Sequence, residues 1–181
     1  MRHLITPLMI ILLCSPVYAA DPQDTLDRYF KVLTTRNIQP LPELMTSTSM
    51  KRLKTIMDTA LLQEGRASVQ LQQRMFGGPV DAEKIKATPP DYYLLRLAEE
   101  ILQAAEMQRF FVDNRRIIGQ IVEADNMVHF VVRLFMHQNA SQNSDLLVYT
   151  LIEEDGVWKM NFPPILTQTL GLIEAMAKPT K

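Results

Sequence analysis

The sequence predicts an α+β fold, in which N-terminal helices pack on a curved four-stranded antiparallel sheet and a short C-terminal helix follows. Two observations support this fold class. Up to about residue 111, apolar residues recur at the three- and four-residue spacing of amphipathic helices. From about residue 117, short runs rich in Val, Ile, Phe, Tyr and Trp alternate with turn residues. Helices first and strands afterwards is the order expected of an α+β protein.

The first twenty residues, MRHLITPLMIILLCSPVYAA, predict a secretory signal peptide over residues 1–20. A basic start precedes an apolar stretch of about ten residues, roughly half the length that a membrane-spanning helix needs. A retained anchor is therefore the weaker alternative. Cys14 also raises lipid attachment, but the bulky pair Leu12-Leu13 precedes it where lipoprotein signals carry small residues. We expect cleavage near Ala20 and export to a bacterial periplasm or the medium.

Composition limits the chemistry of the remaining chain, residues 21–181, which is long enough for one domain. The sequence has 1 Cys, and it lies within the signal, so the exported chain has no disulfide, thiol nucleophile or thiolate metal site. The full sequence has a net charge of −1, and loss of Arg2 with the signal leaves 18 basic against 20 acidic side chains, a net charge of −2. With no clustered basic face, no nucleic-acid partner is expected. No later apolar run has membrane-spanning length, and we expect no transmembrane segment after cleavage and no cofactor.

Helix signals mark the first half of the chain. Asp21-Pro22 is a capping carboxylate followed by a proline at the first helical position, and it predicts a helix over residues 21–36. Pro40 and Pro42 predict a linker. Residues 47–49 offer caps for a second helix, and Gly77-Gly78-Pro79 ends a third. The most apolar helix, over residues 91–111, is expected to be central and buried.

The second half predicts a four-stranded meander with strands over residues 117–122, 127–137, 145–153 and 157–162. Asp125-Asn126 forms the first turn. Residues 138–144, QNASQNS, form a longer polar loop. Glu154-Asp155-Gly156 closes the last hairpin, with a glycine available for positive φ. Two prolines at 163–164 end the sheet, and a helix follows over residues 164–178.

Two segments carry a family resemblance: DTLDRYFKVLTTRNIQPLPELM, residues 24–45, and LLVYTLIEEDGVWKMNF, residues 146–162. They resemble the opening helix and the closing hairpin of the nuclear transport factor 2-like superfamily, as an exported bacterial member. The resemblance implies a single cone-shaped domain with its core over residues 21–162 and a binding cavity between helices and sheet. The extra helical segment before Gly77 and the C-terminal helix depart from the family pattern, and the family's first short strand is not obvious.

The segment NMVHFVVRLFMHQN, residues 126–139, spaces His129, Arg133 and His137 at four-residue intervals. As a strand, it would turn its even-numbered apolar residues to the helices and these three residues to the other face. The two histidines would then lie roughly 26 Å apart, and still roughly 12 Å apart on a helix. They cannot share one metal ion, so no metal site is predicted. We expect a polar sheet face, either solvated or covered by a partner chain.

No catalytic constellation emerges from the sequence. His129 alone could act as a general base, but it is expected on the face away from the cavity. Ketosteroid isomerases use an Asp base with a Tyr and a second acid, and no such pairing can be assigned to Tyr92, Tyr93 or Tyr149, which are expected to be core residues. The chain also lacks a Gly-rich phosphate loop and a G-x-S-x-G elbow.

The leading hypothesis is an exported periplasmic domain without enzymatic activity. It would bind an apolar small molecule or lipid, or an envelope protein, or form a homodimer through the sheet. The 11 methionines, with their flexible thioethers, suit either core packing or an adaptable apolar cavity. The alternatives are a small exported enzyme of the isomerase or cyclase kind, and a structural subunit of a secretion or envelope complex. Ligand-binding residues stay unassigned, and the candidate interface is His129, Arg133 and His137.

Overall fold

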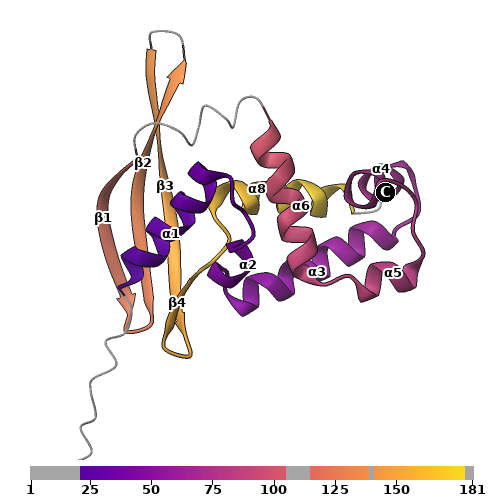
Figure 1. The fold of residues 1–181 in the computed structure, drawn as a ribbon, viewed down its shortest axis with the longest axis horizontal. Helices are drawn as coiled ribbons and strands as arrows, with labels where there is room; N and C mark the ends of the chain where they lie inside the picture. The colour runs from indigo at the N-terminus through magenta and orange to yellow at the C-terminus, as the bar shows by residue number, and fades with distance from the viewer. Residues whose placement is uncertain (1–20, 105–114, 139–140, 178–181) are drawn as a thin grey trace, which may run out of the picture.

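A four-stranded antiparallel sheet and a group of helices beside it make up the fold, as the sequence predicts (Figure 1). The computed structural model describes residues 21–104, 115–138 and 141–177. In chain order the elements are α1 (Pro22–Thr35), α2 (Leu41–Leu44), α3 (Ser47–Leu62), α4 (Arg66–Phe76), α5 (Ala82–Ala87), α6 (Pro90–Gln103), β1 (Arg115–Ala124), β2 (Met127–Gln138), β3 (Ser141–Glu154), β4 (Val157–Met160) and α8 (Pro164–Met176).

Helix boundaries follow the capping signals in most places. The Asp21 carboxylate accepts a 2.9 Å hydrogen bond from the Gln23 amide, and Gly77 ends α4 with a φ of 78°. The cap of α3 is Thr46, one residue before the predicted position, and its hydroxyl accepts from the Ser49 amide. The predicted linker contains the single turn α2, because Pro42 lies at the helix start, where its missing N–H costs nothing.

Helix α5 occupies the segment between Pro79 and the long apolar helix, where the sequence predicted no helix. Asp81 caps it by accepting a 2.7 Å hydrogen bond from the Lys84 amide, and Ile85 anchors it with a buried side chain. The long apolar helix was predicted to reach residue 111. It is α6, which runs to Gln103, and residues 105–114 lie outside the described residues.

The sheet is the predicted meander, in the order β1-β2-β3-β4. Asp155 and Gly156 both take positive φ, 54° and 78°, as a tight hairpin turn requires. The prediction of a polar loop over residues 138–144 is wrong, since β2 and β3 pair as far as Gln138 and Ser141. An antiparallel ladder continues through polar residues because its hydrogen bonds come from the backbone.

One face of the sheet, the inner face, packs against α1 (Figure 1). Most inner-face side chains of β2 to β4 are almost fully buried: Val128, Phe130, Val132, Leu134, Tyr149, Leu151, Trp158 and Met160. From α1, the ring of Tyr29 lies 5.9 Å and that of Phe30 5.3 Å from the ring of Tyr149, centroid to centroid. These aromatic contacts fill the space between α1 and β3.

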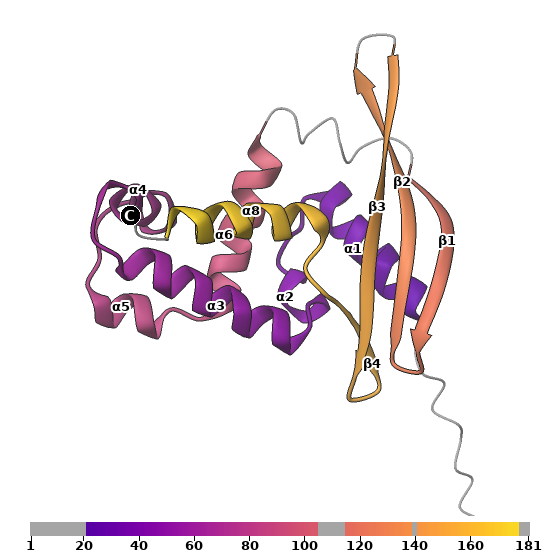
Figure 2. The ribbon, with the colours of Figure 1, turned by 180° about the vertical axis from the view of Figure 1, so that it is seen from behind.

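The sheet is not strongly curled, whereas the sequence predicted a curved sheet. The remaining helices explain the difference. Helices α3 to α6 and α8 lie mainly beyond the β4 side of the sheet and pack on one another, so they do not require the sheet to wrap around them (Figures 1 and 2). On the opposite side, Arg115 ties β1 to α1 by a 3.0 Å ion pair with Asp27 and by lying over the Phe30 ring.

The predicted signal peptide, residues 1–20, lies outside the described residues. Within the parts of the chain that the structure does describe, no helix combines the length and the apolar character needed to cross a bilayer.

The assignment of faces can be tested with two leucines of β3. Leu151, on the inner face, is 0% exposed, and Leu146, on the opposite face, is 55% exposed. We expect Leu151→Ala to lower the free energy of unfolding by about 2–5 kcal/mol, because it leaves a cavity in the core. Leu146→Ala should change it by about 0.5 kcal/mol or less. Urea denaturation of dilute protein measures both, and equal losses would contradict the assignment.

Candidate functional site

Among the described residues, no helix lies over the opposite face of the sheet (Figure 2). Six residues define its centre, which we call the outer sheet surface: Ile121, His129, Val131, Arg133, Leu146 and Val148. The strand register places them together, because Val131 pairs with Val148, Arg133 with Leu146, and His129 with Ile121. Directly opposite residues of an antiparallel pair point to the same side, so the six side chains form one contiguous group.

The outer sheet surface is more apolar than the sequence suggested. Ile121, Leu146 and Val148 are 60%, 55% and 51% exposed, although they are large aliphatic residues. Single exposed apolar residues are ordinary, but a contiguous group on a flat sheet face is typical of an interaction site. The sequence of β3 did not reveal this exposed apolar group. Leu146 and Val148 alternate with the inward Leu147 and Tyr149, and because both sets are apolar, the alternation does not indicate which face is exposed.

His129 has two partners on this face. Its Nδ1 lies 2.9 Å from the Thr150 hydroxyl, and its Nε2 lies 2.5 Å from a Glu123 carboxylate oxygen. The ring is therefore held between β1 and β3, with both nitrogens engaged. A histidine held in this way serves to fix the polar end of the surface.

Arg133 lies near the other end of the surface, directly across from Arg116 of β1. Neither arginine forms an ion pair with another described residue, and the buried Nε of Arg133 has no acceptor among them. Two neighbouring cations repel each other, and an external carboxylate would relieve that repulsion. The surface thus has a cationic end at Arg116 and Arg133 and a carboxylate, Glu123, at its other end.

His137 is the third residue of the predicted interface. Its backbone lies on β2, paired with Gln142, and its side chain is outside the described part of the structure. His129 and His137 are eight positions apart on one strand, which keeps them far from any common ligand. Among residues 21–104, 115–138 and 141–177, no group of three or more His, Cys, Asp or Glu side chains is placed to hold a metal ion.

The tyrosines of the inner face are poorly suited to act as acids or bases on a substrate. Burial raises the pKa of Tyr149 well above its ordinary value, and that of Tyr29 likewise, with the nearby Tyr149 adding to the shift for Tyr29. Both phenols keep their protons at neutral pH and lie among apolar side chains. Tyr93 lies elsewhere, in the helical group, where its hydroxyl donates to Asp58 and Ile85, and burial raises its pKa most.

The free edge of β1 is a poor place for strand addition. Its pairing with β2 is interrupted twice, between Ile117 and Gly119 and between Val122 and Ala124. Such bulges twist an edge and break the regular row of backbone donors and acceptors that an added strand needs. Binding at this end of the molecule therefore favours the outer sheet surface over the edge.

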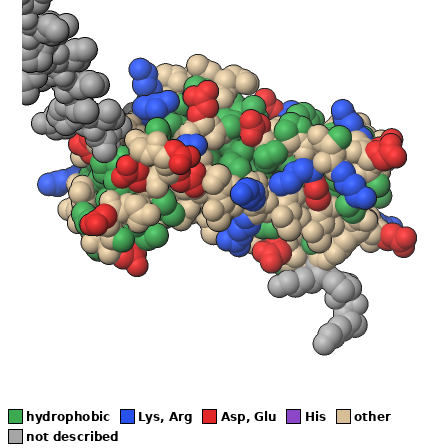
Figure 3. Space-filling model, turned by 90° about the horizontal axis from the view of Figure 1, so that it is seen from below, with side chains coloured by type: hydrophobic (Ala, Val, Ile, Leu, Met, Phe, Trp, Pro, Cys, Tyr) green, Lys and Arg blue, Asp and Glu red, His purple; other side chains and the backbone are tan. Residues whose placement is uncertain are grey.

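Comparisons with known proteins do not assign the chain to a family. No protein-family model matches this chain, and no curated protein or solved structure compared with it matches either. No patch of a single sign of charge marks a partner on the face seen in Figure 3, where Lys/Arg and Asp/Glu side chains are intermixed. The outer sheet surface is the best-defined candidate site on the sheet.

The buried tyrosines predict a loss of stability at high pH. Because their pKa values are raised in the folded state, the folded chain retains protons that the unfolded chain releases above about pH 10. Stability is unaffected by these groups below pH 10 and falls above it. We expect Tyr149→Phe to reduce the fall between pH 8 and 11 by about 1 kcal/mol. Urea denaturation at both pH values measures it, and an unchanged fall would contradict the burial of this phenol.

Proposed function

We propose that this chain is an exported, non-enzymatic binding domain of the bacterial cell envelope and that the outer sheet surface is its docking face. The observation that carries the proposal is the exposure of Ile121 on β1 and of Leu146 and Val148 on β3, on a sheet face that no helix of the described residues covers. Removing such a surface from water is favourable by about 25 cal/mol per Å² of apolar area, so it gains most from a protein partner.

Binding is favoured over catalysis by the contents of the inner face. In the family's enzymes an acid and a tyrosine share the cavity between sheet and helices. Here the corresponding space holds the rings of Tyr29, Phe30 and Tyr149 in mutual contact, and the inner-face side chains of β2 are apolar from Val128 to Leu134. A substrate would have to displace this packing.

We propose a second copy of the chain as the partner, because the charges on the outer sheet surface are self-complementary. Arg116 and Glu123 lie on the same strand, roughly 20 Å apart at ~3.3 Å per residue. A twofold axis in the interface, running across the strands between them, reverses the strand direction of the second copy. Arg116 of each protomer then faces Glu123 of its partner, and the apolar centres meet. If the strands of the two copies ran in the same direction, the cationic end of one outer sheet surface would instead lie over the cationic end of the other.

The size of the face suits such a dimer. Three strands of about 12 residues, spaced ~4.8 Å apart with a rise of ~3.3 Å per residue, cover on the order of 500–600 Å² in projection. Side chains that stand up from the sheet add to this area. Stable interfaces bury about 800 Å² per partner, which is of the same order.

We also propose that the chain is a divergent member of the nuclear transport factor 2-like superfamily. The order of the elements supports the placement, since an opening helix packs on a meander of four strands that closes with an acidic-Gly hairpin. The nearly flat sheet and the filled space under α1 are departures from an open cone. Export rests on the signal sequence at residues 1–20, and amino-terminal sequencing of protein recovered from the periplasm would test it.

The dimer predicts a clear effect of charge at the centre of the surface. The wild-type protein should sediment as a dimer and Val148→Arg as a monomer, because the dimer would bury an unpaired charge in each protomer. Val69→Arg is the matched control, since Val69 is equally exposed, at 55%, but lies on α4. It should remain a dimer. Wild-type protein that is monomeric throughout the accessible concentration range would contradict the proposed partner.

The orientation of the two copies has its own test. Arg116→Glu should weaken the dimer, because it places two carboxylates together at each end of the interface. Adding Glu123→Arg to the same chain should restore association, since every contact then pairs opposite charges again. Sedimentation equilibrium at low salt measures the three dissociation constants. A double variant weaker than Arg116→Glu alone would rule out the antiparallel arrangement.

A further inference from the structure

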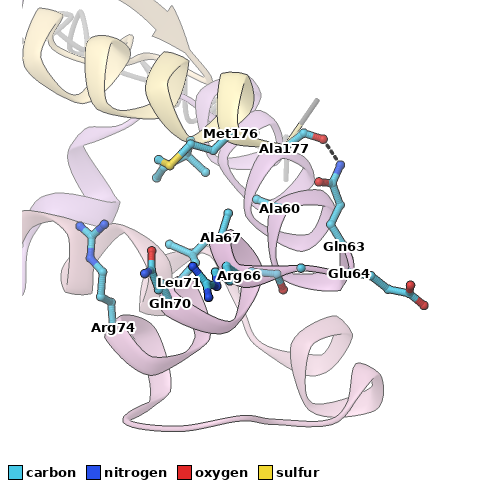
Figure 4. Close-up of a pocket in the computed structure, with 13 residues that line it drawn as sticks. Ala60, Gln63, Glu64, Arg66, Ala67, Gln70, Leu71, Arg74, Met176 and Ala177 are labelled. Atoms are coloured by element: carbon cyan, nitrogen blue, oxygen red, sulfur yellow. Dashed lines mark hydrogen bonds between the residues drawn. The ribbon is translucent and has the colours of Figure 1, made fainter. Parts of the chain in front are cut away.

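A cavity of about 280 Å³ lies at the end of the helical group far from the sheet (Figures 1 and 4). Three helices meet there: the C-terminal end of α3, the exposed side of α4 and the C-terminal end of α8. Ala60 comes from α3, Leu71 from α4 and Ile173 from α8. The cavity thus joins segments more than a hundred residues apart, and it is separate from the outer sheet surface.

The cavity has a mixed lining, in which polar side chains such as Gln63 and Gln70 lie beside a group of apolar ones. Ala60, Leu71 and Ile173 are almost fully buried and form the deeper part. Met176 lies across from Leu71, and its flexible thioether is 54% exposed at the opening (Figure 4). The apolar part of this lining gains free energy from an apolar occupant, because the occupant releases water from both surfaces.

The surrounding helix ends are held in place by hydrogen bonds. The Ser68 hydroxyl and the Gln72 amide both donate to the carbonyl of Leu61, at 2.7 and 2.9 Å. The Gln63 side-chain amide donates to the Ala177 carbonyl and so joins α3 to α8 at one side of the cavity (Figure 4). The site is therefore preformed, and a ligand would lose little free energy in ordering it.

The rim of the cavity carries a cation that has no counter-ion among the described residues. Arg66 and Arg74 both line it. Arg74 is engaged in an ion pair with Glu100 of α6, whereas Arg66 takes part in no ion pair with another described residue. Glu64 is the acid nearest in sequence, and its carboxylate points away from the cavity (Figure 4).

We propose that this cavity binds a medium-chain carboxylate, with the alkyl chain against Leu71, Ile173 and Met176 and the carboxylate at Arg66. Its volume corresponds to about nine or ten non-hydrogen atoms at ~30 Å³ for each water-sized group. Octanoate has this size and this chemistry. A guanidinium and a carboxylate form charge-assisted, bidentate hydrogen bonds, so the headgroup supplies orientation while the chain supplies apolar contact.

The test is titration of the purified protein with sodium octanoate, followed by calorimetry and by amide chemical shifts. We expect one saturable site per chain. Ala67→Trp should abolish it, because Ala67 lines the cavity and an indole there would fill it. Val69→Trp is the matched control, since Val69 is on the same helix and exposed but does not line the cavity, and it should bind as the wild type does.

The charge is tested separately. Arg66→Gln should weaken octanoate binding about tenfold, the loss expected for one charge-assisted contact. Octan-1-ol should bind the wild type about tenfold more weakly than octanoate, and its affinity should not change in Arg66→Gln. Arg28→Gln, which removes an exposed arginine from α1, should leave both affinities unchanged.

Three results would overturn the proposal: no saturable binding to the wild type, equal binding to Ala67→Trp, or equal loss in Arg66→Gln for acid and alcohol. Circular dichroism of each variant establishes that it is folded. None of these outcomes affects the proposed dimer, because sedimentation of the same variants reports on the sheet independently.

Discussion

The contact of Tyr29 and Phe30 with Tyr149 is the interaction on which the rest of this structure depends. A four-stranded sheet with one apolar face must cover that face, and α1 does so with two aromatic rings that meet Tyr149 at 5.9 and 5.3 Å. Arg115, paired with Asp27 and lying over Phe30, holds β1 to the same helix. The Thr25 hydroxyl donates a 3.0 Å hydrogen bond to the Trp158 carbonyl, so α1 is also bonded to β4. One helix thereby connects three of the four strands.

This arrangement determines what the other helices can do. Since α1 occupies the inner face, α3 to α6 and α8 pack chiefly on one another beyond β4, and the space where the family resemblance implied a cavity is filled with rings. One cavity lies instead where helix ends meet, between α3, α4 and α8, and another borders β3 at Thr150. For the same reason, none of the helices that the structure describes is placed to reach the outer sheet surface. The two surfaces suited to binding are thus at opposite ends of the molecule.

Local features of the fold could be predicted from the sequence because they depend on neighbouring residues. Asp21 caps α1, Gly77 ends α4 and Asp155-Gly156 turns the last hairpin, each through backbone conformations that few residue types allow. The alternation in β2 likewise assigned Val128, Phe130, Val132 and Leu134 to the core before any tertiary contact was known. The polar residues after His137 were wrongly predicted to form a loop. They belong to the strands because the backbones of β2 and β3 pair there whatever the side chains are.

By itself, then, the sequence determined the class of the fold, the number and order of strands and the two faces of β2. Only the tertiary structure decided which side chains of β3 stay exposed, since Leu146 and Val148 are apolar like the partly buried Leu147 and the buried Tyr149 beside them. It alone brought Ala60, Leu71 and Ile173 together around a cavity. The physical reason is range: caps, turns and periodicity act within a few residues, whereas covering one surface with another depends on how distant segments pack.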